Sequence, residues 1–63
     1  MISYKVSGKR WELNIIKTAL FAAHIPCLHM EIQGFLLVTC KDNGELVVLQ
    51  NACKLVGLKY QQQ

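Results

Sequence analysis

An apolar repeat of helical period runs through residues 12–24 and stops at Ile25-Pro26. Pro26 has no N–H to donate, and it biases Ile25 away from helical angles, so we expect the helix to end at about His24. On a helical wheel the apolar residues share one broad arc and the polar ones share the other, which is typical of a surface helix with one buried side. The apolar arc holds Leu13, Ile15, Ile16, Ala19, Leu20, Ala22 and Ala23. Phe21 is the exception, because it projects from the polar side of this helix.

After the proline the period changes from helical to two, which indicates a half-buried strand. The more apolar set is predicted to face the core, and it comprises Leu28, Met30 and Ile32. The opposite face of this strand would then carry Cys27, His29 and Glu31. Helix, sharp stop and strand together predict an α+β fold.

Two further strands are predicted on either side of this unit. Residues 2–7 alternate between apolar and polar side chains, which is typical of a strand with one apolar face. Residues 35–40 are apolar on both faces, so this strand is central in the sheet or is covered on its second face by another chain. Its exposed pair is either Phe35 and Leu37, which we favour, or Leu36 and Val38.

Residues 42–57 allow two interpretations. Asn43-Gly44 between apolar runs is a strong hairpin signal, and residues 46–49 would then form the second arm. A helix is favoured because Asp42 and Glu45 have the spacing of a capping box, and Gly57 stands where a helix terminator belongs. The helical wheel also gathers the apolar residues of the segment on one side.

The expected architecture is a single α+β domain over residues 1–60, in the order β-α-β-β-α. Both helices would pack on one face of a three-stranded sheet, residues 58–60 would add at most a short edge strand, and residues 61–63 would fray. The other face of the sheet would be open. It would show Ser3, Lys5, Ser7, Cys27, His29 and Glu31, together with one apolar set from residues 35–40.

The chain resembles a small bacterial family described as putative signal-transducing proteins, which has this element order. The resemblance lies in residues 12–20 (ELNIIKTAL), in Ile25-Pro26-Cys27, in Leu37-Val38 and in an acidic helix start at Asp42. Family members carry Gly-Ile-Pro before the second strand, and here His24 replaces the glycine. The resemblance covers about half of the chain, implies a fold and a non-enzymatic role, and transfers no site residue.

Composition limits the function further. A chain of 63 residues has a thin core, and a hydrophobic content of 52% leaves apolar surface for an oligomer or partner. The net charge of +3 is spread over scattered lysines, and no apolar run is long enough to span a membrane. Three cysteines without a CxxC spacing argue against a disulfide scaffold, so we expect a cytoplasmic protein.

Three functions other than protein–protein contact are indicated less strongly by the sequence. No catalytic triad or glycine-rich phosphate loop is present, so we expect neither an enzyme nor a small-molecule substrate or cofactor. A nucleic-acid interface would use Lys5, Lys9 and Arg10. A metal site for zinc or copper would use His24, Cys27 and His29, although their spacing matches no established finger.

The sequence therefore favours a small regulatory or adaptor protein that acts by protein–protein contact as a homodimer. The open sheet face is the expected contact surface. The predicted contact residues are Phe35 and Leu37, helped by Lys5, His29 and Phe21.

Overall fold

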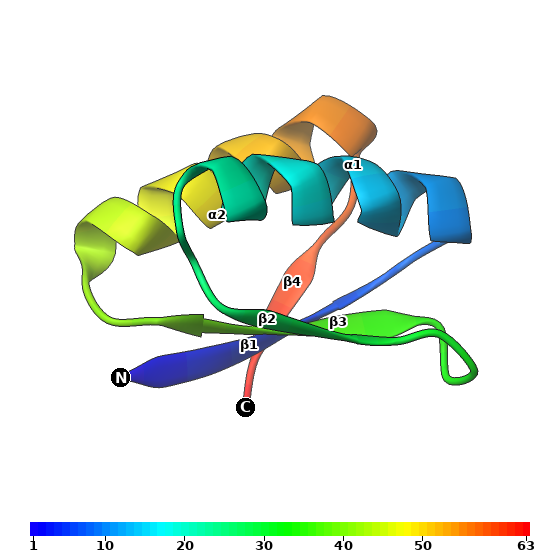
Figure 1. Cartoon of the computed structure of the whole chain (residues 1–63), viewed down its shortest axis with the longest axis horizontal. Helices are drawn as coiled ribbons and strands as arrows, with labels where there is room; N and C mark the ends of the chain where they lie inside the picture. Colours follow the sequence, from blue (N-terminus) through cyan, green and yellow to red (C-terminus); the bar gives the residue numbers. More distant parts are fainter.

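A computed structural model describes all residues of the chain, 1–63, as one sheet covered on one face by two helices (Figure 1). The α+β class and the packing of both helices on a single face agree with the sequence prediction. The prediction of three strands in the order β-α-β-β-α is wrong by one element, since a fourth strand follows the second helix. In chain order the elements are β1 Ile2–Ser7, α1 Arg10–Ala22, β2 Cys27–Met30, β3 Phe35–Cys40, α2 Asn43–Val56 and β4 Tyr60–Gln62.

The sheet has the strand order β2-β3-β1-β4, and every neighbouring pair is antiparallel. β1 and β2 therefore run in the same direction with β3 between them. The prediction that residues 61–63 fray is wrong. Gln61 and Gln62 belong to β4, and the Gln63 N–H donates to the Ser3 carbonyl at 2.9 Å. Their polar side chains gave no strand signal, but an edge strand needs only its backbone groups to extend a sheet.

The core lies between the sheet and the helices. It contains 12 buried residues, drawn from β1, β3, both helices and the segment before β2. The fully buried large side chains are Leu13, Ile16, Leu20, Leu36, Leu49, Val6 and Val38. Tyr4 joins them and makes an edge-to-face contact with Tyr60 of β4, with the ring centroids 5.5 Å apart.

Helix α1 ends in a turn that fixes the start of the next strand. The Ile25 N–H donates to the Leu20 carbonyl at 2.9 Å and the His24 N–H donates to the Phe21 carbonyl at 3.0 Å, which is the bonding pattern of a Schellman motif. His24 occupies the left-handed position of this motif, with φ of 58°, where glycine is usual. The accompanying hydrophobic contact is provided by Ile25 and Leu20, which are both buried.

This turn overturns the predicted orientation of β2. Ile25 is buried, and residues two apart on an extended chain face the same way, so Cys27 and His29 point toward the helices. The register agrees, since these two residues stand opposite the buried Val38 and Leu36 of β3. Leu28 and Met30 lie on the open face instead of in the core. Ile32, predicted to be the third core residue of this strand, is 98% exposed in the turn that follows it.

Residues 43–56 form helix α2, as favoured from the sequence, and the alternative hairpin is excluded. The Asp42 carboxylate accepts from the Glu45 N–H, and the Glu45 carboxylate accepts from the Lys41 N–H, both at 2.9 Å. Gly57, with φ of 72°, ends the helix in the left-handed conformation. Capping by Asp42 and Glu45 therefore replaces the hairpin turn that Asn43-Gly44 suggested.

Candidate interaction surface on the open sheet face

The face of the sheet away from the helices carries a cluster of apolar side chains from two neighbouring strands. The register places Leu28 opposite Leu37 and Met30 opposite Phe35, so the four side chains form a compact square across β2 and β3. We call these four residues the open-face patch. Leu28 is 58% exposed, and no helix covers this side of the sheet (Figure 1). The remainder of this face is polar and comprises Ser3, Lys5, Ser7, Thr39 and Gln61.

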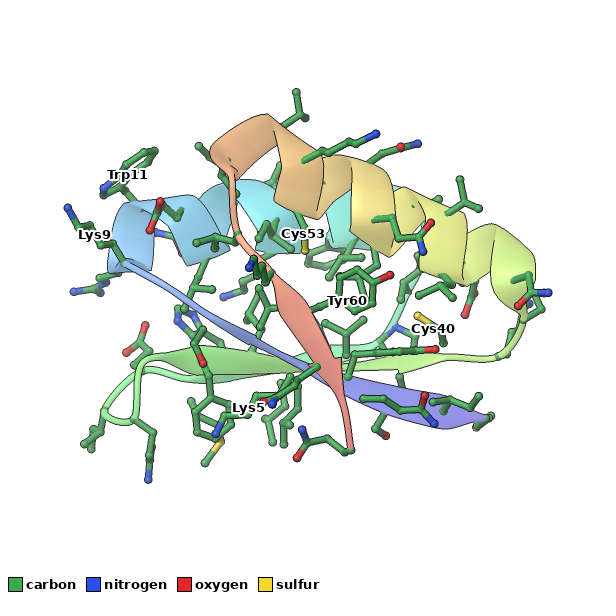
Figure 2. All side chains as sticks on the ribbon, turned by 180° about the vertical axis from the view of Figure 1, so that it is seen from behind. Lys5, Lys9, Trp11, Cys40, Cys53 and Tyr60 are labelled. Carbon is green, nitrogen blue, oxygen red and sulfur yellow. The ribbon has the colours of Figure 1, made fainter.

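Lys5 borders the open-face patch from β1. Its side chain lies on the open side of the sheet (Figure 2), and its Nζ stands 4.5 Å from the centroid of the Phe35 ring. The lysine stem thus covers part of the aromatic ring, while the ammonium group makes a cation–π contact with it. No strand residue on this face carries a carboxylate, so Lys5 gives the rim of the patch a positive charge.

A hollow of about 320 Å³ lies at one side of the patch, beside Leu28 and Leu37. Ser3 and Thr39 line its polar edge, where their hydroxyl oxygens are 3.4 Å apart. An apolar centre with a polar, partly charged rim is the usual anatomy of a protein–protein contact surface. The patch contains no pair of side chains suited to proton transfer or nucleophilic attack.

The structure brings together three of the five predicted contact residues: Phe35, Leu37 and Lys5 lie side by side on the open face. Two are placed elsewhere. His29 faces the helices, and Phe21 projects from α1 in the helix layer with 74% of its surface exposed.

Leu28 and Met30 belong to the surface but were assigned to the core from the sequence. The sequence signal that would have placed them correctly is Ile25. An apolar residue just after a helix end takes the buried position that packs against the last turn. Because side chains alternate along the strand that follows, this buried residue determines which strand residues face the core.

The three residues of the predicted metal site are not gathered into one. No group of three or more His, Cys, Asp and Glu side chains in the structure is arranged to hold a metal ion. Cys27 and His29 face α1, where the Nδ1 atom of His29 is buried without a hydrogen-bond partner, and His24 is exposed in the turn after α1. The imidazoles of His24 and His29 are therefore held apart. The turn leaves the His24 side chain at the surface, whereas the His29 side chain points toward α1.

All three cysteines are free thiols. Burial raises the pKa of the Cys27 thiol, an effect that the positive charge of Lys17 partly offsets. Burial, together with the carboxylates of Glu45 and Asp42, raises the pKa of Cys40, and burial alone raises the pKa of Cys53 to about 11. The thiolate forms are therefore disfavoured, which is the opposite of what a nucleophilic cysteine requires.

The basic residues of the predicted nucleic-acid interface do not form a single surface. Lys5 lies on the open side of the sheet, whereas Lys9 stands at the start of α1 in the helix layer (Figure 2). Arg10 is engaged with Glu31, with the Nη2 and Oε1 atoms 3.7 Å apart. These charges are thus separated by the sheet or partly neutralised.

Comparisons with known proteins give no relative from which a role can be transferred. No protein-family model matches the chain, and no match was found among curated proteins or among solved structures. The resemblance to the putative signal-transducing family consequently rests on the quoted residues alone. Neither helix has the length and apolar character that crossing a membrane would require.

Proposed function

We propose that this chain is a small, non-enzymatic regulatory or adaptor protein, and that two copies associate through the open-face patch. The observation that carries the proposal is the square of Leu28, Met30, Phe35 and Leu37, which no element of the chain covers. A cytoplasmic location is part of the proposal, supported by the three free cysteines.

The occupant that fits this surface is a second copy of the same sheet face. Two sheets that pack face to face lie about 10 Å apart, and their side chains interdigitate between them. A two-fold axis would bring the apolar square onto its own mate, and Lys5 would remain at the rim of the contact. The helices of both copies would stay on the outside, so the pair would share one core between two sheets.

Sedimentation equilibrium at several protein concentrations tests this arrangement. We expect a dimer whose dissociation constant does not rise with salt, since the contact is apolar and each copy carries a net charge of +3 that salt screens. Leu37→Glu replaces one of the four apolar side chains of the patch by a carboxylate and should produce a monomer at all concentrations.

The matched control is Leu55→Glu, the same substitution at an exposed position of α2 in the helix layer. This variant should dimerise as the wild type does. A wild-type chain that is monomeric at every concentration would overturn the proposed self-association. A dimer that Leu55→Glu abolishes and Leu37→Glu preserves would move the interface to the helices.

A further inference from the structure

A groove lies at the edge of the sheet farther from β2, between α2 and β4. The structure has a groove of about 440 Å³ there, formed where α2 passes over the beginning of β4. Figure 2 shows Cys53 on the sheet side of α2 and Tyr60 on β4 below it. The lining includes Gln50, Cys53 and Lys54 from α2 and Leu58, Lys59 and Tyr60 from the segment that follows.

The groove has a neutral interior and a cationic rim. Cys53 is buried and Leu58 is half-buried, and the pKa of the Cys53 thiol, raised to about 11 by burial, keeps it uncharged at neutral pH. Gln50 crosses the groove and donates from Nε2 to the Tyr60 hydroxyl at 2.7 Å. The exposed Lys54 and Lys59 form no ion pair, and no acidic residue lines the groove.

The edge strand beside this groove presents unpaired backbone groups. The Gln63 N–H bonds to the Ser3 carbonyl, so the register makes Ser3 with Gln63 and Lys5 with Gln61 the hydrogen-bonded pairs between β1 and β4. The N–H and C=O groups of Tyr60 and Gln62 consequently point away from β1. Such an edge is able to accept one more strand.

From these features we propose that the groove binds an extended acidic segment of another protein, which adds to β4 as a fifth strand. The backbone of the segment would pair with Tyr60 and Gln62. One of its apolar side chains would enter the groove over Cys53 and Leu58, and neighbouring acidic side chains would meet Lys54 and Lys59. Alternation along the added strand places every second side chain on the groove side.

The edge formed by β2 does not offer the same combination. The hollow next to β2 is lined by Lys17 and Glu31 together, so its charges have both signs. Charge complementarity with an acidic segment therefore singles out β4.

Nuclear magnetic resonance with synthetic peptides tests the proposal directly. The probe is a blocked hexapeptide of alternating glutamate and valine, compared with one in which lysine replaces glutamate. The acidic peptide should shift the amide resonances of Tyr60 and Gln62 and slow the hydrogen exchange of these amides. Its affinity should fall as salt is raised, because the ion pairs with the lysines are exposed.

Charge reversal supplies the matched variants. Lys54→Glu combined with Lys59→Glu should weaken binding of the acidic peptide by about tenfold or more, whereas Lys41→Glu, at the other end of α2, should change it by less than about twofold. The Leu37→Glu variant should bind as the wild type does, so the outcome is independent of self-association through the open-face patch.

Several results would overturn the proposal. Equal binding of the lysine peptide, or of the double variant, would remove the role of the two lysines. Shifts confined to Phe35 and Leu37 would place the peptide on the open face. Slow exchange of the Tyr60 and Gln62 amides before peptide is added would mean that a second copy already pairs with this edge.

Discussion

The two faces of the sheet are built from alternate residues of the same strands, yet they differ completely in what covers them. On the helix side, Val6, Leu36 and Val38 are fully buried. On the other side, Phe35 and Leu37 belong to β3, the six-residue strand that also holds Leu36 and Val38, yet they remain partly exposed. β3 is apolar on both faces, but the chain supplies helices for only one of them. Apolar character alone therefore does not decide burial, because the available covering elements also limit it.

The strongest test of this difference between the two faces is to truncate two neighbouring leucines of β3 to alanine. Leu36→Ala should lower the free energy of unfolding by about 2–5 kcal/mol, because a fully buried side chain leaves a cavity. Leu37→Ala should cost about 1 kcal/mol or less in the monomer. Urea unfolding at low protein concentration, where any dimer has dissociated, measures both values. Equal losses would show that the two faces are buried alike.

A smaller effect that distinguishes the two faces is the change of stability with pH. The buried thiols Cys40 and Cys53 both lie on the covered side. Burial raises the pKa of Cys53 from the ordinary value of a cysteine thiol, which applies to the unfolded chain, to about 11 in the folded one. Between these values the unfolded chain releases its proton first, so stability should fall as the pH rises through this window.

Unfolding at about pH 8 and at about pH 10.5 measures this loss, and Cys53 should account for a share on the order of 1 kcal/mol. Cys53→Ala serves as the comparison, because its constant packing defect cancels when only the change with pH is considered. A wild-type chain and a variant with the same pH dependence would contradict the assignment of this loss to Cys53.

The smallest expected effect concerns the turn that decides which side chains of β2 reach each face. His24→Gly should stabilise the protein by about 0.5 kcal/mol, because glycine adopts the left-handed conformation without strain but gains freedom in the unfolded chain. Thermal unfolding compares it with His24→Ala, which keeps the strain and should gain nothing. A glycine variant less stable than the wild type would indicate that the imidazole itself contributes to the turn.

Much of the fold could be predicted from local patterns. The helical repeat before Ile25-Pro26 identified α1, and the Asp42, Glu45 and Gly57 signals identified α2 against a competing hairpin. The fourth strand was missed as a full element because Gln61 and Gln62 bring no hydrophobic pattern. Its stability comes from backbone pairing with β1, which is a contact between distant parts of the chain.

The candidate site was predicted in part for a similar reason. The position of Lys5 follows from alternation within β1, whereas alternation within β3 left Phe35 and Leu37 as the favoured one of two possible exposed pairs. Placing His29 and Met30 requires knowing which alternate residues of β2 face the helices. Both sets of alternate residues are apolar enough to face a core. The choice depends on Ile25 packing against Leu20 in the turn that ends α1, and this helix-end contact overrides the stronger hydrophobicity of Leu28 and Met30.

The turn at His24 and Ile25 also gives the protein an unusual route to a changed surface. Because side chains alternate, inserting or deleting one residue between Ile25 and Cys27 would exchange the two sets of β2 while β1, β3 and both helices kept their sequences. The outward-facing leucine and methionine would move toward the helices, and a thiol and an imidazole would take their places. A single-residue length change is thus a larger alteration of this surface's chemistry than most substitutions on it.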